Sequence, residues 1–135
     1  GAPVTVIKRL RLSDAVPFCV ETSYLPHHRV PGLVAADVFA APSLYALLRE
    51  RFGMTVATSD FHVSVDIAPD TEADLLGLAP GAGALAMRST VYDRDGRPAE
   101  FLISWNHPDR VAFESLRDDT GPVKSVFTDW ASPRP

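Results

Sequence analysis

The chain has 135 residues, of which 46% are hydrophobic and 22% are charged, and its formal net charge is −4 at pH 7. This composition is typical of a globular domain that can bury its own core, and the scattered basic residues argue against a surface that neutralises nucleic-acid phosphates. No apolar run approaches the roughly 20 residues of a membrane-spanning helix, and the single cysteine, Cys19, excludes an internal disulfide and suits a reducing cytoplasm.

The first quarter of the chain predicts a β-hairpin followed by a loop. Residues 4–12 and 17–25 are rich in β-branched and aromatic side chains, and the stretch 13–16 between them suits a turn. Pro26, Pro31 and Gly32 then predict a loop, and the pattern changes to helical from Pro42.

The middle of the chain predicts two helices separated by a strand. Ser43 suits an N-cap, leucines recur after it at helical spacing, and Gly53 suits the C-terminal stop. Residues 55–67 return to a strand pattern, and residues 69–77 predict a short helix.

The last third predicts a second hairpin and two further strands. Residues 84–92 and 98–105 flank the Asp-Arg-Asp-Gly turn at 93–96. Beyond it, 111–115 and 123–130 are expected to form short strands joined by a polar loop through a Gly-Pro pair. Because strands dominate, we expect an α+β fold with one antiparallel sheet and helices laid on a face.

One supersecondary unit occurs twice in the chain, which indicates an internal duplication. Residues 1–24 and 81–105 both open with Gly-Ala, run through an extended stretch with one cation, and break at a turn closed by proline. The second copy is preceded by the strand and helix of 61–78. The first copy has no such counterpart, so we expect the native protein to extend upstream of Gly1.

Catalytic and metal-binding signatures are absent from the sequence. It contains no GxSxG, CxxC or HExxH motif and no glycine-rich phosphate loop, and its four histidines lack metal-ligand spacing. We therefore expect neither an enzyme nor a bound metal or cofactor.

A few residues could instead form a pocket for an anion. Arg9 and Arg11 project from the same face of a predicted strand, roughly 6.6 Å apart. Ser43 heads a helix whose first amides can bind an anion, and Glu100 and Asn106 share one face of the second hairpin. The alternative is that both arginines simply face water.

Several short motifs occur in a specific order along residues 1 to 114. They are Arg9-Leu10-Arg11, Val20 to Pro26, Pro31-Gly32-Leu33, Ser43-Leu44-Tyr45, Arg51-Phe52-Gly53, Leu75-Leu76-Gly77, Tyr92-Asp93 and Asp109-Arg110. This set resembles the UTRA domain, the effector-binding module of HutC-type GntR-family bacterial transcription regulators.

The resemblance implies a chorismate-lyase-like fold, with a central antiparallel sheet, flanking helices and an internal duplication. It assigns 1–130 to one ligand-binding domain, leaves 131–135 as a tail, and places a DNA-binding winged helix-turn-helix, with the domain's first strand and helix, in a part absent from this chain. It also implies a cytoplasmic homodimer that senses a small anionic metabolite, either a sugar phosphate or a carboxylate.

The resemblance also implies roles for individual residues. Arg9, Arg11 and Ser43 match positions that hold the acid group of the ligand, and Glu100 matches a glutamate that contacts its sugar side. Asn106 is expected to contact the remaining polar groups of the ligand.

Two departures from the family pattern change the specificity end of the expected pocket. Asn106-His107 stands where such relatives often have Tyr-Arg, and Thr58 or Ser59 stands where some have a further arginine. A carboxylate ligand is therefore as open as a sugar phosphate. Because a fold does not fix function, two alternatives also remain: a small lyase-like enzyme on the same fold, or a dimerisation scaffold with a vestigial pocket.

Overall fold

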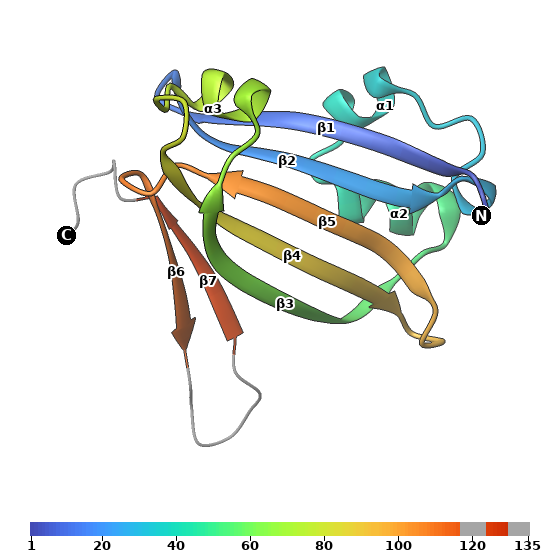
Figure 1. Ribbon diagram of the computed structural model, residues 1–135. Coiled ribbons are helices and arrows are strands. Elements are labelled where there is room, and N and C mark those ends of the chain that lie inside the picture. The colour runs from blue at the N-terminus through green and yellow to red at the C-terminus, as the bar shows by residue number, and fades with distance from the viewer. Residues whose placement is uncertain (117–123, 130–135) are drawn as a thin grey trace. The chain divides into compact units, whose positions relative to one another are not determined.

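The computed structural model describes the backbone of residues 1–116 and 124–129, with side chains through residue 113. Its elements, in chain order, are β1 (Val4–Ser13), β2 (Val16–Pro26), the 3-10 helix η1 (His27–Arg29), α1 (Ala35–Ala40), α2 (Leu44–Phe52), β3 (Val56–Ile67), α3 (Asp70–Leu76), β4 (Gly83–Asp93), β5 (Pro98–Asn106), β6 (Val111–Leu116) and β7 (Lys124–Asp129). Five strands form one sheet in the order β1-β2-β5-β4-β3, and β6 and β7 form a second sheet (Figure 1).

The order of strands in the larger sheet confirms the predicted fold class and the internal duplication. The two hairpins, β1–β2 and β4–β5, meet through their second strands, and β3, which precedes the second hairpin, pairs with β4 at the sheet edge. The fold is therefore α+β with a central antiparallel sheet.

The chain separates into two compact units. The first unit comprises Gly1–Arg9, Glu21–Val63 and Met87–Ser104, and the second comprises Leu10–Val20, Ser64–Ala86 and Trp105–Pro135. Each of the five strands of the larger sheet contributes residues to both units.

The core of the first unit forms around α2. Its buried side chains are Leu25, Val30, Leu44, Leu48, Met54 and Ala99. The helix begins and ends as predicted, because the Ser43 hydroxyl accepts the amide of Ala46 at 3.0 Å and Gly53 takes a left-handed conformation with φ of 66°. Burying each large aliphatic side chain contributes about 1.5–3 kcal/mol, so this packing holds α2 against the strands.

The short helix α1 differs from the predicted loop. Its six residues are too few to be stable alone, and no Ser, Thr, Asp or Asn precedes them as a cap. The Asp37 carboxylate instead accepts the backbone amide of Val34 at 3.0 Å and lies 2.7 Å from Nη1 of Arg51 on α2. A local contact of Asp37 with the Val34 amide and an ion pair with the distant Arg51 therefore support α1, and local patterns cannot reveal the second of these.

The second unit has a smaller core, in which Ala68, Ala73 and Ala84 are buried beside Leu78 and Trp105. Arg110 stabilises this unit by two hydrogen bonds. Its Nη1 atom donates to the carbonyl of Pro17 at 2.7 Å and to that of Leu76 at 3.3 Å. One guanidinium group therefore joins the start of β2 to the end of α3.

The turn between β1 and β2 has an uncommon backbone. Both of its central residues, Asp14 and Ala15, have positive φ angles of 48° and 64°. This is the conformation of a two-residue type I′ hairpin turn, which glycine and asparagine favour. Ala15 adopts it at a cost, because its Cβ crowds the backbone there.

The two last strands confirm the predictions for 111–115 and 123–130 within the described residues. They pair antiparallel, with Val111 opposite Asp129 and Leu116 opposite Lys124. The predicted loop between them and the predicted tail at 131–135 lie outside the residues that the structure describes.

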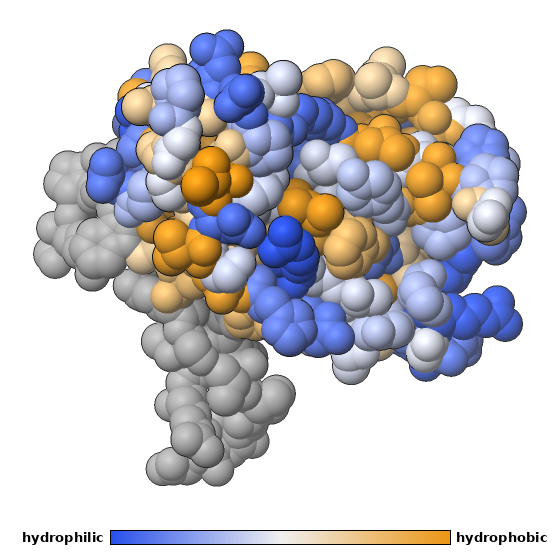
Figure 2. Space-filling model, viewed as in Figure 1, coloured by the Kyte–Doolittle hydropathy of each residue, from blue (hydrophilic) through white to orange (hydrophobic). Residues whose placement is uncertain are grey.

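Hydrophobic side chains reach the surface in several places, and Figure 2 shows them among polar residues on one face. Phe39 of α1 has the largest exposed fraction of these in the described residues, 83%. No helix in the described part of the chain has the length and apolar character to cross a membrane.

Candidate functional site

In the first unit, two buried carboxylates lie beside α2, one of them ion-paired and the other hydrogen-bonded. Only 7% of Glu21 and 3% of Glu100 are exposed. Nη2 of Arg9 lies 3.3 Å from Oε1 of Glu21, and the hydroxyl of Tyr45 donates to Oε1 of Glu100 at 2.7 Å. Because buried carboxylates are costly without such partners, each pair compensates the burial of its carboxylate, and we call these four residues the polar cluster.

All three charged members of this cluster influence the pKa of Tyr45. Burial raises the pKa of Tyr45 above its usual range, and the charge and hydrogen bond of Glu100 raise it further. Glu21 acts in the same direction, and Arg9 opposes them. Tyr45 therefore remains a neutral hydrogen-bond donor at physiological pH.

Two buried polar atoms of this region have no hydrogen-bond partner among the described residues. They are Oγ of Ser23, a residue with no exposed surface, and Nε of Arg9. Ser23 lies two residues beyond Glu21 on β2, so the two side chains share a face of the strand. Buried groups of this kind are ordinarily satisfied by ordered water or a bound molecule, which suits this face to a polar ligand group.

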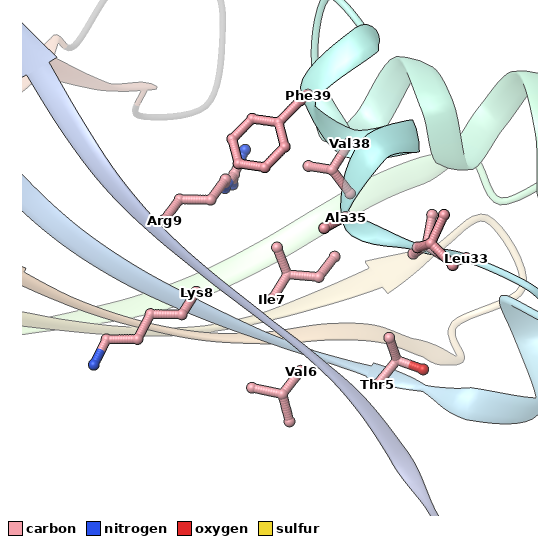
Figure 3. A pocket seen from close by; sticks show the side chains of 10 residues that line it. Thr5, Val6, Ile7, Lys8, Arg9, Leu33, Ala35, Val38 and Phe39 are labelled. Carbon is pink, nitrogen blue, oxygen red and sulfur yellow. The ribbon is translucent and has the colours of Figure 1, made fainter.

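A cavity of about 150 Å³ lies between β1 and α1, with Arg9 in its wall. It is lined by Thr5, Val6, Ile7, Lys8, Arg9, Leu33, Val34, Ala35, Val38 and Phe39. Figure 3 shows the side chains of Arg9 and Ile7 on the side of β1 that faces Val38 and Phe39, whereas Lys8 points the other way. Arg9 thus connects the cavity to the polar cluster.

A second, wider depression of about 410 Å³ is lined by Pro26, His28, Arg29, Arg97 and Pro98. Its Arg29 is already engaged, because Nη2 donates to Oδ2 of Asp93 at 2.6 Å. Asp93 also accepts backbone amides at the β4–β5 turn, and these hydrogen bonds lower its pKa. This arginine therefore supports the turn.

Three of the five predicted site residues lie in the first unit. Arg9 and Glu100 both belong to the polar cluster, in which Glu100 accepts the Tyr45 hydroxyl and Arg9 pairs with Glu21. Ser43 is also in this unit, where its exposed hydroxyl caps α2.

The other two predicted residues belong to the second unit. The guanidinium carbon of Arg11 lies 5.8 Å from the ring centroid of Phe18. Asn106 is fully buried, and its Nδ2 atom donates to the carbonyl of Leu85 at 3.0 Å. Ligand contact by these five residues stays a prediction.

Glu21 and Tyr45 were not predicted as members of the site. A signal for each was available: Glu21 interrupts an apolar strand in the hairpin that carries Arg9, and Tyr45 follows the Ser43 cap within the first helical turn. Among the residues that the structure describes, no His, Cys, Asp and Glu side chains group to hold a metal ion.

Comparison with known proteins identifies the family. The sequence profile of the UTRA domain matches residues 1–112. The HTH-type transcriptional repressor PhnF of Mycolicibacterium smegmatis is 35% identical over 120 residues, which are 86% of this chain and 47% of that protein. The HTH-type transcriptional regulator Rv0792c of Mycobacterium tuberculosis is 30% identical over 108 residues, 78% of this chain and 40% of that protein. The chain thus spans less than half the length of either relative.

Solved structures agree with this assignment. The effector domain of PhnF from Mycobacterium smegmatis superposes with a TM-score of 0.75 at 28% identity, covering 87% of this chain and 72% of that one. The ligand-binding domain of a putative GntR-family regulator from Bordetella bronchiseptica shares the fold, with a TM-score of 0.79 at 24% identity over 85% of this chain and 73% of that one. The expectation of a non-enzyme is confirmed, and the chain belongs to the UTRA domain family of GntR-type transcription regulators.

Proposed function

We propose that this domain binds a small anionic metabolite through Arg9 and thereby controls DNA binding by a helix-turn-helix elsewhere in the whole protein. The observation that carries the proposal is the position of Arg9, which lines a cavity while the buried Glu21 holds one of its terminal nitrogens. An arginine in that position is pre-oriented, and 29% of its side chain remains exposed.

Arginine suits this role because its planar group carries five N–H donors and can grip a carboxylate or a phosphate through two hydrogen bonds. Glu100 and Tyr45 can in turn read hydroxyl or amine groups of the same ligand. Arg11, Ser43 and Asn106 remain proposed contacts on the resemblance to the family. The ligand would be a sugar phosphate or a carboxylate.

The names of the relatives support a regulatory role. PhnF and the NagR protein of Bacillus subtilis are both named HTH-type transcriptional repressors. By analogy, the whole protein would be a HutC-type, homodimeric, cytoplasmic regulator. The effector would act by binding one arrangement of the dimer more tightly than the other, and such coupling is typically about 1–3 kcal/mol.

A thermal-shift screen of the 135-residue chain against sugar phosphates and small carboxylates tests the proposal. A ligand that binds only the folded chain raises its melting temperature, by an amount that grows with the logarithm of ligand concentration over Kd. We expect at least one anion to do so while its neutral analogue does not. If no anion shifts the melting temperature, the domain is a dimerisation scaffold with a vestigial pocket.

A further inference from the structure

We propose that the effector is an apolar monocarboxylic acid, whose acid group binds Arg9 and whose hydrocarbon body fills the cavity between β1 and α1. This inference rests on the proposed function, in which Arg9 holds an acid group. It adds the chemical class of the rest of the molecule.

The walls of the cavity are mainly hydrocarbon. Ile7 of β1 faces the side chains of Val38 and Phe39, and Leu33 continues the wall toward the loop (Figure 3). Phe39 is 83% exposed, and removing an aromatic side chain of this size from water is favourable. A ligand with an apolar body would supply that cover.

The polar groups of the lining cannot serve a sugar. The hydroxyl of Thr5 already shares a 2.9 Å hydrogen bond with Nδ1 of His27, and Lys8 points away from α1 (Figure 3). Arg9 is therefore the charged side chain on the cavity side of the strand. A polyhydroxylated ring placed against Ile7 and Val38 would lose its hydrogen bonds to water without replacement, which is unfavourable.

The size of the cavity limits the hydrocarbon body. Its volume of about 150 Å³ equals that of an engineered protein cavity known to hold benzene. It is smaller than the roughly 300–1,000 Å³ of pockets for larger ligands. A body of about six carbons therefore fits.

The charges near Arg9 favour one negative charge on the ligand over two. Glu21 lies 3.3 Å from the guanidinium group, and Glu100 is bonded to Tyr45 in the same cluster. A phosphate dianion on Arg9 would bring a second negative charge close to the buried Glu21 carboxylate, and like charges in a poorly solvated site repel strongly. A monocarboxylate meets less of this repulsion.

The test compares three probes by calorimetric titration of the 135-residue chain: benzoate, its neutral isostere benzamide, and glucose 6-phosphate. We expect benzoate to bind at least tenfold more tightly than either of the others. The substitution Phe39→Ser should weaken benzoate binding about fivefold or more. Because Phe39 is exposed, this change should leave the fold intact. The matched control is Phe61→Ser, at another exposed phenylalanine in the same unit, and it should leave benzoate binding unchanged.

Each contrary result overturns a distinct part of the inference. Binding of glucose 6-phosphate but not of benzoate would reject the apolar acid and leave the proposed function standing. Equal binding of benzamide and benzoate would show that Arg9 does not hold an acid group. Unchanged benzoate binding by Phe39→Ser would show that the hydrocarbon body does not lie in the cavity between β1 and α1. If neither these anions nor any anion of the thermal-shift screen binds, the inference and the proposed function both fail.

Discussion

The hydroxyl of Tyr45, in the first turn of α2, donates a 2.7 Å hydrogen bond to Oε1 of Glu100 on β5. Glu100 is 3% exposed, so this bond replaces part of the hydration that the carboxylate loses on folding. It also orients α2 over the polar cluster that contains Arg9.

Replacing Tyr45 with Phe should destabilise the chain by about 1–3 kcal/mol, because a buried acceptor then loses its donor. The midpoint of urea unfolding measures this change. Glu100→Gln is the matched variant, because its amide oxygen can still accept the Tyr45 hydroxyl and should cost less. Equal stability of Tyr45→Phe and the native chain would show that water satisfies Glu100 equally well.

Alkaline pH should weaken the fold through the same residue. Folding raises the pKa of Tyr45 above the unfolded value of about 10, so both states keep the proton below that pH. Above it, the unfolded chain loses the proton first, and stability falls as pH rises by at most about 1.4 kcal/mol per pH unit. The effect should be smaller than this limit, because Tyr45 is 40% exposed and solvent screens its neighbours.

Unfolding of the native chain and of Tyr45→Phe between pH 9 and about pH 11.5 measures this effect. The native chain should lose stability more steeply than the variant. Parallel curves would mean that the tyrosine environment in the fold resembles water.

Arg110→Met should destabilise the chain by about 2–3 kcal/mol, because a charged donor to two carbonyl groups disappears. Methionine retains most of the length and apolar contact of the side chain. Arg94→Met, at an exposed position of the β4–β5 turn, removes the same charge and should change stability by less than about 0.5 kcal/mol. Equal losses in the two variants, measured by urea unfolding, would contradict the role given to Arg110.

Ala15→Gly should stabilise the chain by about 0.5–1 kcal/mol. Glycine relieves the strain of about 1–2 kcal/mol at φ of 64°, and the extra freedom of the unfolded chain offsets part of this gain. Ala57→Gly, in the exposed strand β3, should instead lower the stability of the chain, because Ala57 has no positive φ for glycine to relieve. A lower melting temperature for Ala15→Gly would show that the turn does not store this strain.

The strands and the helix α2 could be predicted because their signals are local. Their content of β-branched and aromatic residues predicts β1 and β2, while Ser43 and Gly53 mark the ends of α2 by side-chain chemistry and backbone freedom. The helix α1 was not predicted, because no capping residue precedes it and the ion pair of Asp37 with Arg51 joins residues far apart in the sequence.

The site was predictable only in part for a similar reason. Arg9 and Glu100 carry charge in otherwise strand-like segments and so attract notice. Their partners Glu21 and Tyr45 carry weaker sequence signals, and the pairing of Arg9 with Glu21 and of Tyr45 with Glu100 follows only from the fold. The hydrogen bond from Asn106 to the Leu85 carbonyl likewise follows from strand pairing, which residue type alone does not show.

The central claim is that Arg9 holds the acid group of an effector, and calorimetric titration of Arg9 variants tests it most directly. The titrant is the anion that binds most tightly in the thermal-shift screen. Arg9→Gln should weaken its binding at least tenfold, and Arg94→Gln should leave it unchanged. Arg9→Gln alone leaves the buried Glu21 without its ion-pair partner and so risks unfolding the chain. The double variant Arg9→Gln with Glu21→Gln removes both charges of the ion pair and should show the same loss of binding. Native affinity in the folded Arg9 variants would contradict the account.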